Sequence, residues 1–468
     1  MSQSKFTETD TEAFYDAEDS LYRSFWDSEG SLHWGYFLDL TATPLEEFIP
    51  ACQRWNEYML DKSGITASSR VLDLGCGNGN TAVWLAEKTG CEVTGIDLSN
   101  VRISNALAKA QDYPSLRLQF QKASATNLLF EEGTFTHVWS QATLYHIHQR
   151  ELALREIYRV LREGGIFLFD DLVTPTKQIS QQARKYVYDR LLFEPTYSHS
   201  DYIDVLSQLG LMVLQSKDLS QHLHKSYELL SQLAKPQYPD LSAAYDKMCE
   251  AISAGELSWS FFFGEKVSSL RARLSWIYET NDPEKLEDKY DAWSRIYDAE
   301  LDGPYRISPI KSARALAKIL PNQDASILDA GAGTGMVGEA LAELGYTNLT
   351  AIDLSEEMLE VARKKQVYKA LYQDNLEAPL NCFTPDGFDA IIAVGVFTFG
   401  HAPPEALHNL DPLLKSGGYF VLTVRVDYHD NNKALHEVLK ELSWSLISRE
   451  EFTIFETESM YAIVFQKN

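Results

Sequence analysis

A glycine-rich signature occurs twice in the chain, in the same register. Residues 73–79 read DLGCGNG and residues 329–335 read DAGAGTG, so each copy begins with an acid and continues with alternating glycines. A second acid, Asp97 or Asp353, follows the first acid of each copy at the same distance, 97 minus 73 or 353 minus 329. A chance glycine cluster would not recur with its surroundings in step, so the duplication indicates two nucleoside-binding units.

Length and charge narrow the class of protein. The chain has 468 residues, which is too long for one ordinary core and fits two domains of ordinary size. Its 45% hydrophobic and 23% charged residues are typical of a globular protein. The 42 basic and 67 acidic residues give a net charge of -25 at pH 7. This charge would repel phosphates, so we expect no nucleic acid partner.

Cysteine usage and hydropathy favour a cytoplasmic protein. The cysteines show neither paired spacing nor a zinc-site pattern, so we expect free thiols and no metal: Cys52, Cys76, Cys91, Cys249 and Cys382. Residues 1–8 lack the apolar stretch of a signal peptide. No apolar run is long enough to cross a bilayer, and we therefore expect no membrane span.

Apolar strands alternate with helical segments in both halves. The first half predicts strands at 70–74, 90–97, 136–140 and 165–170, with helices at 81–88 and 151–161. The second half predicts strands at 327–330, 349–353, 388–394 and 418–424. This alternation predicts an α/β fold made of two tandem Rossmann-like, doubly wound domains.

The segment between the two expected sheets is aromatic-rich. Residues 176–280 are expected to be helical and to form a lid inserted in the first domain. Residues 279–285 are the expected linker, because Pro283 lies among charged residues and would begin a helix. The expected domains are therefore residues 1–280 with the helical lid and residues 281–468.

The glycine spacing differs from that of dinucleotide-binding enzymes. Those enzymes use GxGxxG, whereas the last position here is Asn80 in one copy and Met336 in the other. The GxGxG spacing after an acid resembles motif I of class I S-adenosylmethionine-dependent methyltransferases. This resemblance implies that each domain binds S-adenosylmethionine, releases S-adenosylhomocysteine and needs no metal. It assigns donor binding to Asp73, Gly75, Gly77, Gly79, Asp97, Asp329, Gly331, Gly333, Gly335 and Asp353.

Within that family, the acid that ends the second strand binds both ribose hydroxyls, a role that falls on Asp97 and Asp353. A carboxylate accepts from two vicinal hydroxyls in a charge-assisted contact. The family often has an acid and a small residue after the third strand, near the adenine. Asp374 and Asn375 fit that place in the second half, whereas the first half has Ser124 and Ala125, so a hydroxyl would replace the carboxylate.

The two halves resemble different branches of the family. Residues 14–16 (FYD), 33–36 (HWGY) and 138–141 (VWSQ) resemble the sarcosine/dimethylglycine N-methyltransferases and the tocopherol-type C-methyltransferases. Residues 290–293 (YDAW) and 395–404 (GVFTFGHAPP) resemble the methyltransferase-like 27 group of the Williams-Beuren region. Because one fold accepts many substrates, neither resemblance fixes the methyl acceptor.

Aromatic residues are the candidate acceptor-binding groups, since ring faces attract a methylated ammonium. In the first half the candidates are Tyr15, Trp26, Trp34, Tyr36, Trp139 and Tyr145, and in the second half they are Tyr290, Trp293, Tyr297 and Phe397. The alternative is that these residues belong to the core, as most aromatic residues do. Trp139 and Gln141 are favoured as catalytic residues because they end a strand at its carboxyl edge, where open α/β sheets bind ligands.

Two histidines are candidate general bases for a hydroxyl or a protonated amine acceptor. His146 lies beyond the strand at 136–140, and His401 lies in a Gly-His loop of the second half. Each has the structural alternative of a satisfied, non-catalytic histidine. His148 follows at an alternate position, but no third metal ligand accompanies the pair.

The sequence therefore predicts a bifunctional small-molecule methyltransferase. The preferred acceptor is an amine of the glycine/sarcosine/dimethylglycine (betaine) type. The alternatives are C-methylation of a prenylated quinol, S-methylation of a thioether, or a second half that is a donor-binding regulatory module.

Overall fold

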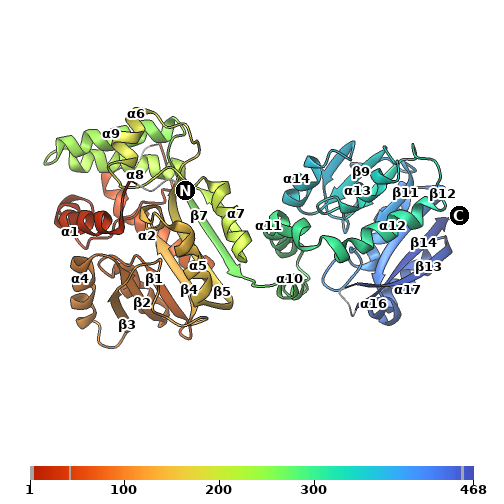
Figure 1. Cartoon of the computed structure of the whole chain (residues 1–468), viewed down its shortest axis with the longest axis horizontal. Helices are drawn as coiled ribbons and strands as arrows, with labels where there is room; N and C mark the ends of the chain where they lie inside the picture. The colour runs from red at the N-terminus through yellow and green to blue at the C-terminus, as the bar shows by residue number, and fades with distance from the viewer. Residues whose placement is uncertain (1–4, 42–43, 455–457) are drawn as a thin grey trace. The chain divides into compact units, whose positions relative to one another are not determined.

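The computed structural model describes residues 5–41, 44–454 and 458–468. It divides into two compact units, unit 1 (Met1–Ser268) and unit 2 (Ser269–Asn468), which are described separately (Figure 1). The expected boundary at 280 lies inside unit 2. Helix α10 (Leu270–Ile277) belongs to that unit because its Arg273 side chain donates to the Glu300 carboxylate at 2.7 Å.

Unit 1 contains a seven-stranded mixed sheet. Its strands are β1 (Arg70–Leu74), β2 (Glu92–Asp97), β3 (Arg117–Lys122), β4 (Phe135–Gln141), β5 (Leu161–Val173), β6 (Leu211–Asp218) and β7 (Ser258–Lys266). The spatial order is β3-β2-β1-β4-β5-β7-β6. Strands β1 to β5 pair in parallel, and β7 pairs antiparallel with both β5 and β6. The order reverses at β1, so the carboxyl ends of β1 and β4 open a crevice there.

Unit 2 repeats this sheet strand for strand. Its order is β10-β9-β8-β11-β12-β14-β13, with β14 antiparallel to both neighbours. The strands are β8 (Ile327–Ala330), β9 (Leu349–Asp353), β10 (Ala370–Gln373), β11 (Phe388–Ala393), β12 (Leu414–Arg425), β13 (Trp444–Ile454) and β14 (Glu458–Lys467). The predicted α/β class with two tandem Rossmann-like domains is confirmed.

Helices flank both sheets (Figure 1). Those of unit 1 are α1 (Glu8–Phe25), α2 (Phe48–Ser63), α3 (Asn80–Thr89), α4 (Asn100–Gln111), α5 (Arg150–Val160), α6 (Gln181–Ala183), α7 (His199–Leu209), α8 (Ser220–Ala234) and α9 (Pro239–Ser253). Those of unit 2, after α10, are α11 (Pro283–Glu300), α12 (Ile307–Ala317), α13 (Met336–Glu343), α14 (Glu356–Lys364), α15 (Leu407–Leu410), α16 (Val426–Asn431) and α17 (Lys433–Glu441). As expected, Pro283 begins a helix, with Asp282 as its cap.

The expected all-helical lid is wrong in part. Residues 176–280 include strands β6 and β7, which complete the first sheet. The inserted helices are α8 and α9, which lie between these two strands in the chain and gather near α6 (Figure 1). In unit 2 the corresponding strands β13 and β14 are separated in sequence by residues 455–457 alone, so no helical pair is inserted there. The two units therefore differ in this insertion, which is present in unit 1 and absent from the described part of unit 2.

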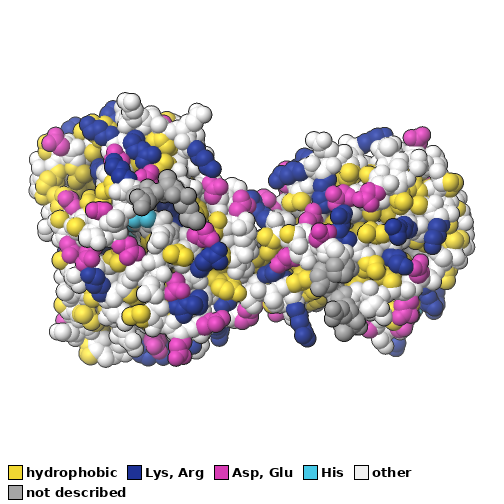
Figure 2. Space-filling model, in the orientation of Figure 1, with side chains coloured by type: hydrophobic (Ala, Val, Ile, Leu, Met, Phe, Trp, Pro, Cys, Tyr) yellow, Lys and Arg dark blue, Asp and Glu magenta, His cyan; other side chains and the backbone are white. Residues whose placement is uncertain are grey.

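Charged side chains of both signs are interspersed over the face of the molecule in view (Figure 2). Across the described ranges, no helix is both long and apolar enough to cross a membrane.

A buried carboxylate ties the core of unit 1 together. Asp170 on β5 accepts hydrogen bonds from the indole Nε1 of Trp55 at 2.7 Å and of Trp259 at 2.9 Å, and from the backbone N–H of Ala142 at 3.2 Å. Burial raises the pKa of Asp170 to about 6, and these hydrogen bonds oppose the rise. The folded state therefore holds the proton more tightly than the unfolded chain does.

We predict that Asp170 makes unit 1 less stable as the pH rises. Between pH 3.8 and about 6 the unfolded chain loses this proton before the folded chain does. The free energy of unfolding should therefore fall over that window, by about 3 kcal/mol. Urea titrations followed by tryptophan fluorescence should show that Asp170→Asn removes this contribution to the pH slope. The exposed control Asp112→Asn should keep it, and equal slopes for the two variants would contradict the prediction.

Candidate active site

The duplicated loops have nearly the same geometry in the two units. In unit 1 the Asp97 carboxylate, at the end of β2, accepts from the backbone N–H of Gly77 at 3.0 Å and of Ser99 at 2.9 Å. In unit 2 Asp353 accepts from Gly333 at 2.7 Å and from Ser355 at 2.9 Å. Each carboxylate is thus oriented by two backbone donors, and lone pairs remain on its oxygens for a ligand.

The first two glycines of each loop line a cavity, whereas the third does not. Gly79 and Gly335 are the N-caps of α3 and α13, with φ of 78° and 86°. A Cβ on Gly79 would lie 2.9 Å from the Phe120 ring, and one on Gly335 would lie 3.0 Å from the Tyr368 ring. These glycines let the helix pack closely on its neighbours, and their contact with the donor stays a prediction.

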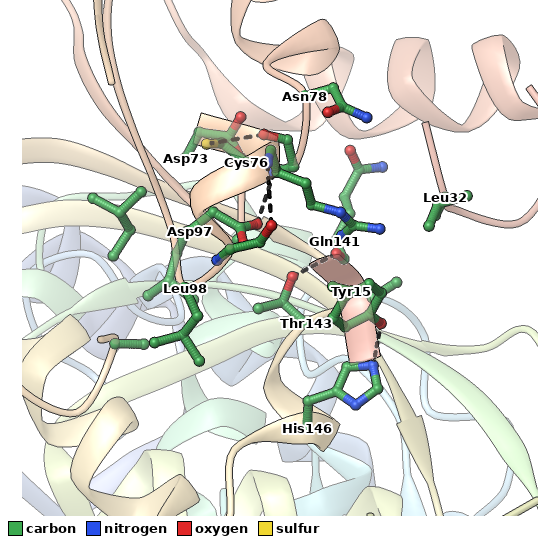
Figure 3. A pocket seen from close by; sticks show the side chains of 18 of the residues that line it. Tyr15, Leu32, Asp73, Cys76, Asn78, Asp97, Leu98, Gln141, Thr143 and His146 are labelled. Atoms are coloured by element: carbon green, nitrogen blue, oxygen red, sulfur yellow. Dashed lines mark hydrogen bonds between the residues drawn. The ribbon is translucent and has the colours of Figure 1, made fainter. Parts of the chain in front are cut away.

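The cavity of unit 1 has a volume of about 110 Å³ and lies at the carboxyl ends of β1, β2 and β4 (Figure 3). It brings together these residues predicted from the sequence: Tyr15, Asp73, Gly75, Gly77, Asp97, Ala125, Gln141 and His146. Residues that the sequence reasoning missed also line it, chiefly Glu8, Arg102 and Thr143. Side chains from well-separated segments thus converge on one cavity.

Helix α1 forms one wall of this cavity, a role that the sequence did not reveal. Its Asp16 accepts from the Ser99 hydroxyl at 2.5 Å, and its Asp19 accepts from the Asn78 amide at 2.9 Å. In unit 2, α11 does the same: Asp291 accepts from the Ser355 hydroxyl at 2.5 Å. The Tyr-Asp pair at 15–16 recurs at 290–291, so this repeat was the available signal.

A tyrosine and a histidine meet in each unit. The Tyr15 hydroxyl hydrogen-bonds to His146 Nε2 (Figure 3). In unit 2 the Tyr290 hydroxyl lies 2.6 Å from His401 Nε2, and His401 Nδ1 lies 2.9 Å from the Phe399 carbonyl. A carbonyl only accepts, so Nδ1 of His401 carries the proton and Nε2 accepts from Tyr290.

Both histidines are held neutral. Burial lowers the pKa of His146 well below its ordinary value, and the nearby Arg102 guanidinium lowers it further. Burial also lowers the pKa of His401, against a hydrogen bond to Phe399. Each imidazole is therefore neutral at neutral pH, and in His401 the free lone pair lies on Nε2, as a general base at that atom requires.

The first acid of each loop is buried. Burial, followed by the neighbouring acid Asp97, raises the pKa of Asp73 to about 7, and its Oδ2 has no hydrogen-bond partner among the described residues. Burial also raises the pKa of Asp329 to about 7, but there Oδ2 accepts from the Tyr368 hydroxyl at 2.6 Å. Asp329 does not line the unit 2 cavity, so its predicted donor contact is not reproduced.

Two adjoining cavities occupy the corresponding place in unit 2. The first, of about 150 Å³, is lined by Gly331, Gly333, Asp353, Asp374 and Asn375 among others, as predicted. The second, of about 170 Å³, is lined by Trp293 and by residues of α10, α12, β12 and β14. Tyr290, Tyr297 and His401 line both cavities.

Two kinds of comparison with known proteins agree with this geometry. A protein-family model described as a methyltransferase domain matches residues 72–169 and again residues 328–422. The chain carries two tandem methyltransferase domains. It is an S-adenosylmethionine-dependent methyltransferase.

Relatives of this methyltransferase act on several kinds of acceptor. The (+)-O-methylkolavelool synthase of Herpetosiphon aurantiacus is 27% identical over 54% of this chain and 87% of its own length. The sarcosine/dimethylglycine N-methyltransferase of Halorhodospira halochloris is 28% identical over 54% of this chain and 94% of its own length. The glycine/sarcosine/dimethylglycine N-methyltransferase of Actinopolyspora halophila is 31% identical over 46% of this chain but 37% of its own length.

The residues of both methyltransferase domains fit the donor. Asp97 and Asp353 present oriented carboxylates for ribose hydroxyls, and Gly75 and Gly331 adopt φ of 81° and 76° beside the cavities. The unpaired Oδ2 of Asp73 fits an ammonium donor such as that of a methionine group. Within the described ranges, no group of three or more His, Cys, Asp or Glu side chains is placed to hold a metal ion.

Most of the aromatic candidates of unit 1 belong to the core. Trp139 is fully buried, does not line the cavity, and donates from Nε1 to Gln141 Oε1 at 3.0 Å, so it positions Gln141 instead of touching an acceptor. Trp34 and Tyr145 are buried, and Tyr36 stacks on the His222 ring. None of these three lines the cavity either.

Three further candidates are placed differently from the prediction. Ser124 donates to Glu8 at 2.6 Å and does not line the cavity, so Glu8 supplies the carboxylate there. Trp26 lines a separate, more open cavity that shares Ser31, His33, Asn80 and Thr81 with the first. Phe397 is fully buried in the core of unit 2 and lines neither of its cavities.

We predict two donor sites per methyltransferase chain. Calorimetry with S-adenosylmethionine should give a stoichiometry near two, which falls to near one in either Asp97→Ala or Asp353→Ala. Each lost carboxylate removes charge-assisted hydrogen bonds of about 1.5–3 kcal/mol, or roughly 10- to 150-fold in affinity. The matched controls Asp112→Asn in unit 1 and Asp386→Asn in unit 2 should keep both sites. A wild-type stoichiometry near one would contradict the prediction.

Proposed function

We propose that unit 1 transfers methyl groups to the amine of a small amino acid of the glycine, sarcosine or dimethylglycine type. The named N-methyltransferase relatives support this class of acceptor. The donor supplies the methyl group, and the side chains of unit 1 bind the acceptor and receive its proton. The resemblance of the second half to the methyltransferase-like 27 group stays a prediction.

The observation that carries the proposal is a guanidinium without a carboxylate partner beside two unpaired donors. Arg190 donates to the Tyr186 carbonyl and to Met248 Sδ, interacts with the Tyr22 hydroxyl and lies 5.3 Å from the centre of the Tyr245 ring, and no carboxylate pairs with it among the described residues. The Tyr245 hydroxyl and the Trp26 Nε1 are buried without hydrogen-bond partners, and their rings meet edge to face at 6.3 Å. A guanidinium and two unpaired donors fit a carboxylate ligand.

These hydrogen-bond donors, Arg190, Tyr245 and Trp26, are named the carboxylate-binding cluster. Tyr145 connects this cluster to the methyl-donor cavity. The charge of Arg190 acts on Tyr145, and the Tyr145 hydroxyl interacts with that of Tyr15, which lines the cavity. A small amino acid with its carboxylate at the cluster and its nitrogen toward Tyr15 would span these groups.

The Tyr15–His146 pair would receive the proton that the acceptor nitrogen loses. Glycine and sarcosine carry protons on nitrogen that must leave for the amine to react, and neutral His146 can receive one through Tyr15. Dimethylglycine also loses its ammonium proton before attack, but its methylated product has no proton left to lose. The pair should therefore matter most for the early methylation steps.

Two residues missed in the sequence complete the proposed donor site. Glu8 takes the place near Ser124 that Asp374 holds in unit 2, so we assign it the adenine amino group. Arg102 is buried, and its Nε and Nη2 lack hydrogen-bond partners, although Nε lies 3.7 Å from Asp19. We assign it the carboxylate of the donor. Tyr15 stacks on this guanidinium at 3.9 Å and fixes its direction.

We predict that Arg190→Met raises the KM for sarcosine by about 10- to 100-fold, the effect of losing a charge-assisted hydrogen bond. The assay uses the full chain carrying Asp353→Ala, so that unit 1 alone is read, with product mass spectrometry. Dimethylethanolamine, which lacks the carboxylate, should not distinguish the variant from the parent. Arg155→Met, at an exposed ion pair with Glu151, is the control.

The same assay separates the alternatives. If unit 1 methylates a prenylated quinol or a thioether and not the amines, the proposed amine acceptor is wrong. An equal loss for sarcosine and dimethylethanolamine in Arg190→Met would show that Arg190 supports the fold instead of a carboxylate.

A further inference from the structure

The second cavity of unit 2 is lined mainly by apolar side chains, unlike the carboxylate-binding cluster of unit 1. Its wall combines apolar side chains of α10, α11, β12 and β14, among them Leu274, Ile277, Leu301, Val424 and Met460. It shares Tyr290, Tyr297, Gly331, Gly333 and His401 with the donor cavity. The position fits a methyl acceptor, because an acceptor must reach the donor without leaving the protein.

The charged groups of this wall are already paired. Arg425 donates to Glu458 at 3.0 Å and to Asp427 at 2.8 Å, so the guanidinium has no free charge and the group keeps one net negative charge. Arg425 and Glu458 are the charged side chains among its described lining residues, apart from His401, which is neutral. An anionic acceptor would lose hydration here without gaining an unpaired cation.

The aromatic residues of the wall also do not form an open cage. Trp293 stacks with Tyr290 at 6.4 Å and meets Tyr297 edge to face at 4.7 Å, and its Nε1 donates to Glu300 at 2.7 Å. These rings use part of their faces on one another. They offer an apolar surface in preference to a box for an ammonium.

The Tyr290–His401 pair lies where the two cavities join. The Tyr290 proton is donated to His401 Nε2, so the Tyr290 oxygen keeps lone pairs that accept from a further group. This pair suits an acceptor that must lose a proton as it is methylated. A neutral hydroxyl has that requirement, whereas a tertiary amine does not.

We propose that unit 2 methylates the hydroxyl of a neutral, largely apolar small molecule held in this second cavity. The inference rests on the proposed function of a two-site methyltransferase and names the acceptor class of the second site. The acceptor oxygen bonds to the methyl carbon as the carbon–sulfur bond of the donor breaks, and that electron pair stays on sulfur. The hydroxyl proton passes to the Tyr290 oxygen while the Tyr290 proton passes to His401 Nε2. The products are a methyl ether, S-adenosylhomocysteine and an imidazolium.

The test uses the full chain with Asp97→Ala, which leaves the donor site of unit 2 intact. The probes are 2-naphthol and geraniol, with sarcosine for comparison, and mass spectrometry identifies the products. We expect methyl ethers from at least one hydroxyl probe and no product from sarcosine. Tyr290→Phe should lower kcat by about 100-fold or more, because the proton acceptor is lost. It should leave the Kd of 2-naphthol, measured by fluorescence, within about threefold.

A second variant tests the cavity itself. Leu274 lines the wall and is only partly buried, so Leu274→Glu should fold and place a carboxylate in the cavity. We expect its KM for the hydroxyl probe to rise about 10-fold or more, with Leu274→Met restoring the parent value. Leu446→Ser, at a side chain that is 59% exposed on β13, is the control. Calorimetry confirms that each variant still binds the donor.

Three results would overturn the inference. They are methylation of sarcosine in place of the hydroxyl probes, binding of 2-naphthol without turnover while the donor is bound, and no binding of either probe. The chain with Asp353→Ala reports unit 1 separately. Loss of sarcosine methylation there would therefore contradict the proposal for unit 1 without touching the proposal for unit 2.

Discussion

The capture of an acidic side chain by a backbone amide of the glycine loop is the contact on which each site depends. Asp97 accepts from Gly77, and Asp353 accepts from Gly333. Gly77 and Gly333 adopt φ of 52° and 53°, in the left-handed region where other residues are strained, so the loop can turn its N–H toward the acid. The carboxylate is thereby fixed before a ligand arrives, which reduces the ordering cost of binding.

Helices α1 and α11, which cover the two sites, are held by the residues that follow each acid. The serine two residues beyond each acid donates its backbone N–H to that acid, caps the next helix, and gives its hydroxyl to Asp16 of α1 or Asp291 of α11. One serine therefore links the strand, the following helix and the cavity wall. A tyrosine next to each of these aspartates then reaches a histidine, so the Tyr–His pair is placed by the same chain of contacts.

Local patterns predicted the elements around the loops well. Strands at 70–74, 327–330 and 349–353 have the predicted bounds, because a buried parallel strand is a continuous apolar run, and the glycine turn ends the first two. Strands β3 and β10 were missed, and so were the antiparallel strands β6, β7, β13 and β14, since their pairing depends on distant segments. Trp139 and Phe397 point into the core, and Glu8 reaches the cavity from a separate helix. Strand position indicates the edge of the sheet, but tertiary packing decides which side chains reach the ligand.

The two sites diverge where the shared contact no longer constrains them. Arg102 lies five residues after Asp97, and Met358 lies five residues after Asp353, so the same helical position carries a charge in one unit and none in the other. Unit 1 places α8 and α9 between its last two strands in the chain, whereas α10 supplies apolar wall residues in unit 2. The contacts of Gly77 and Gly333 with Asp97 and Asp353 tolerate such changes because the backbone amides do not depend on the replaced side chains. Selection can therefore alter the acceptor of one unit while the glycine loop and its acid keep the donor in place.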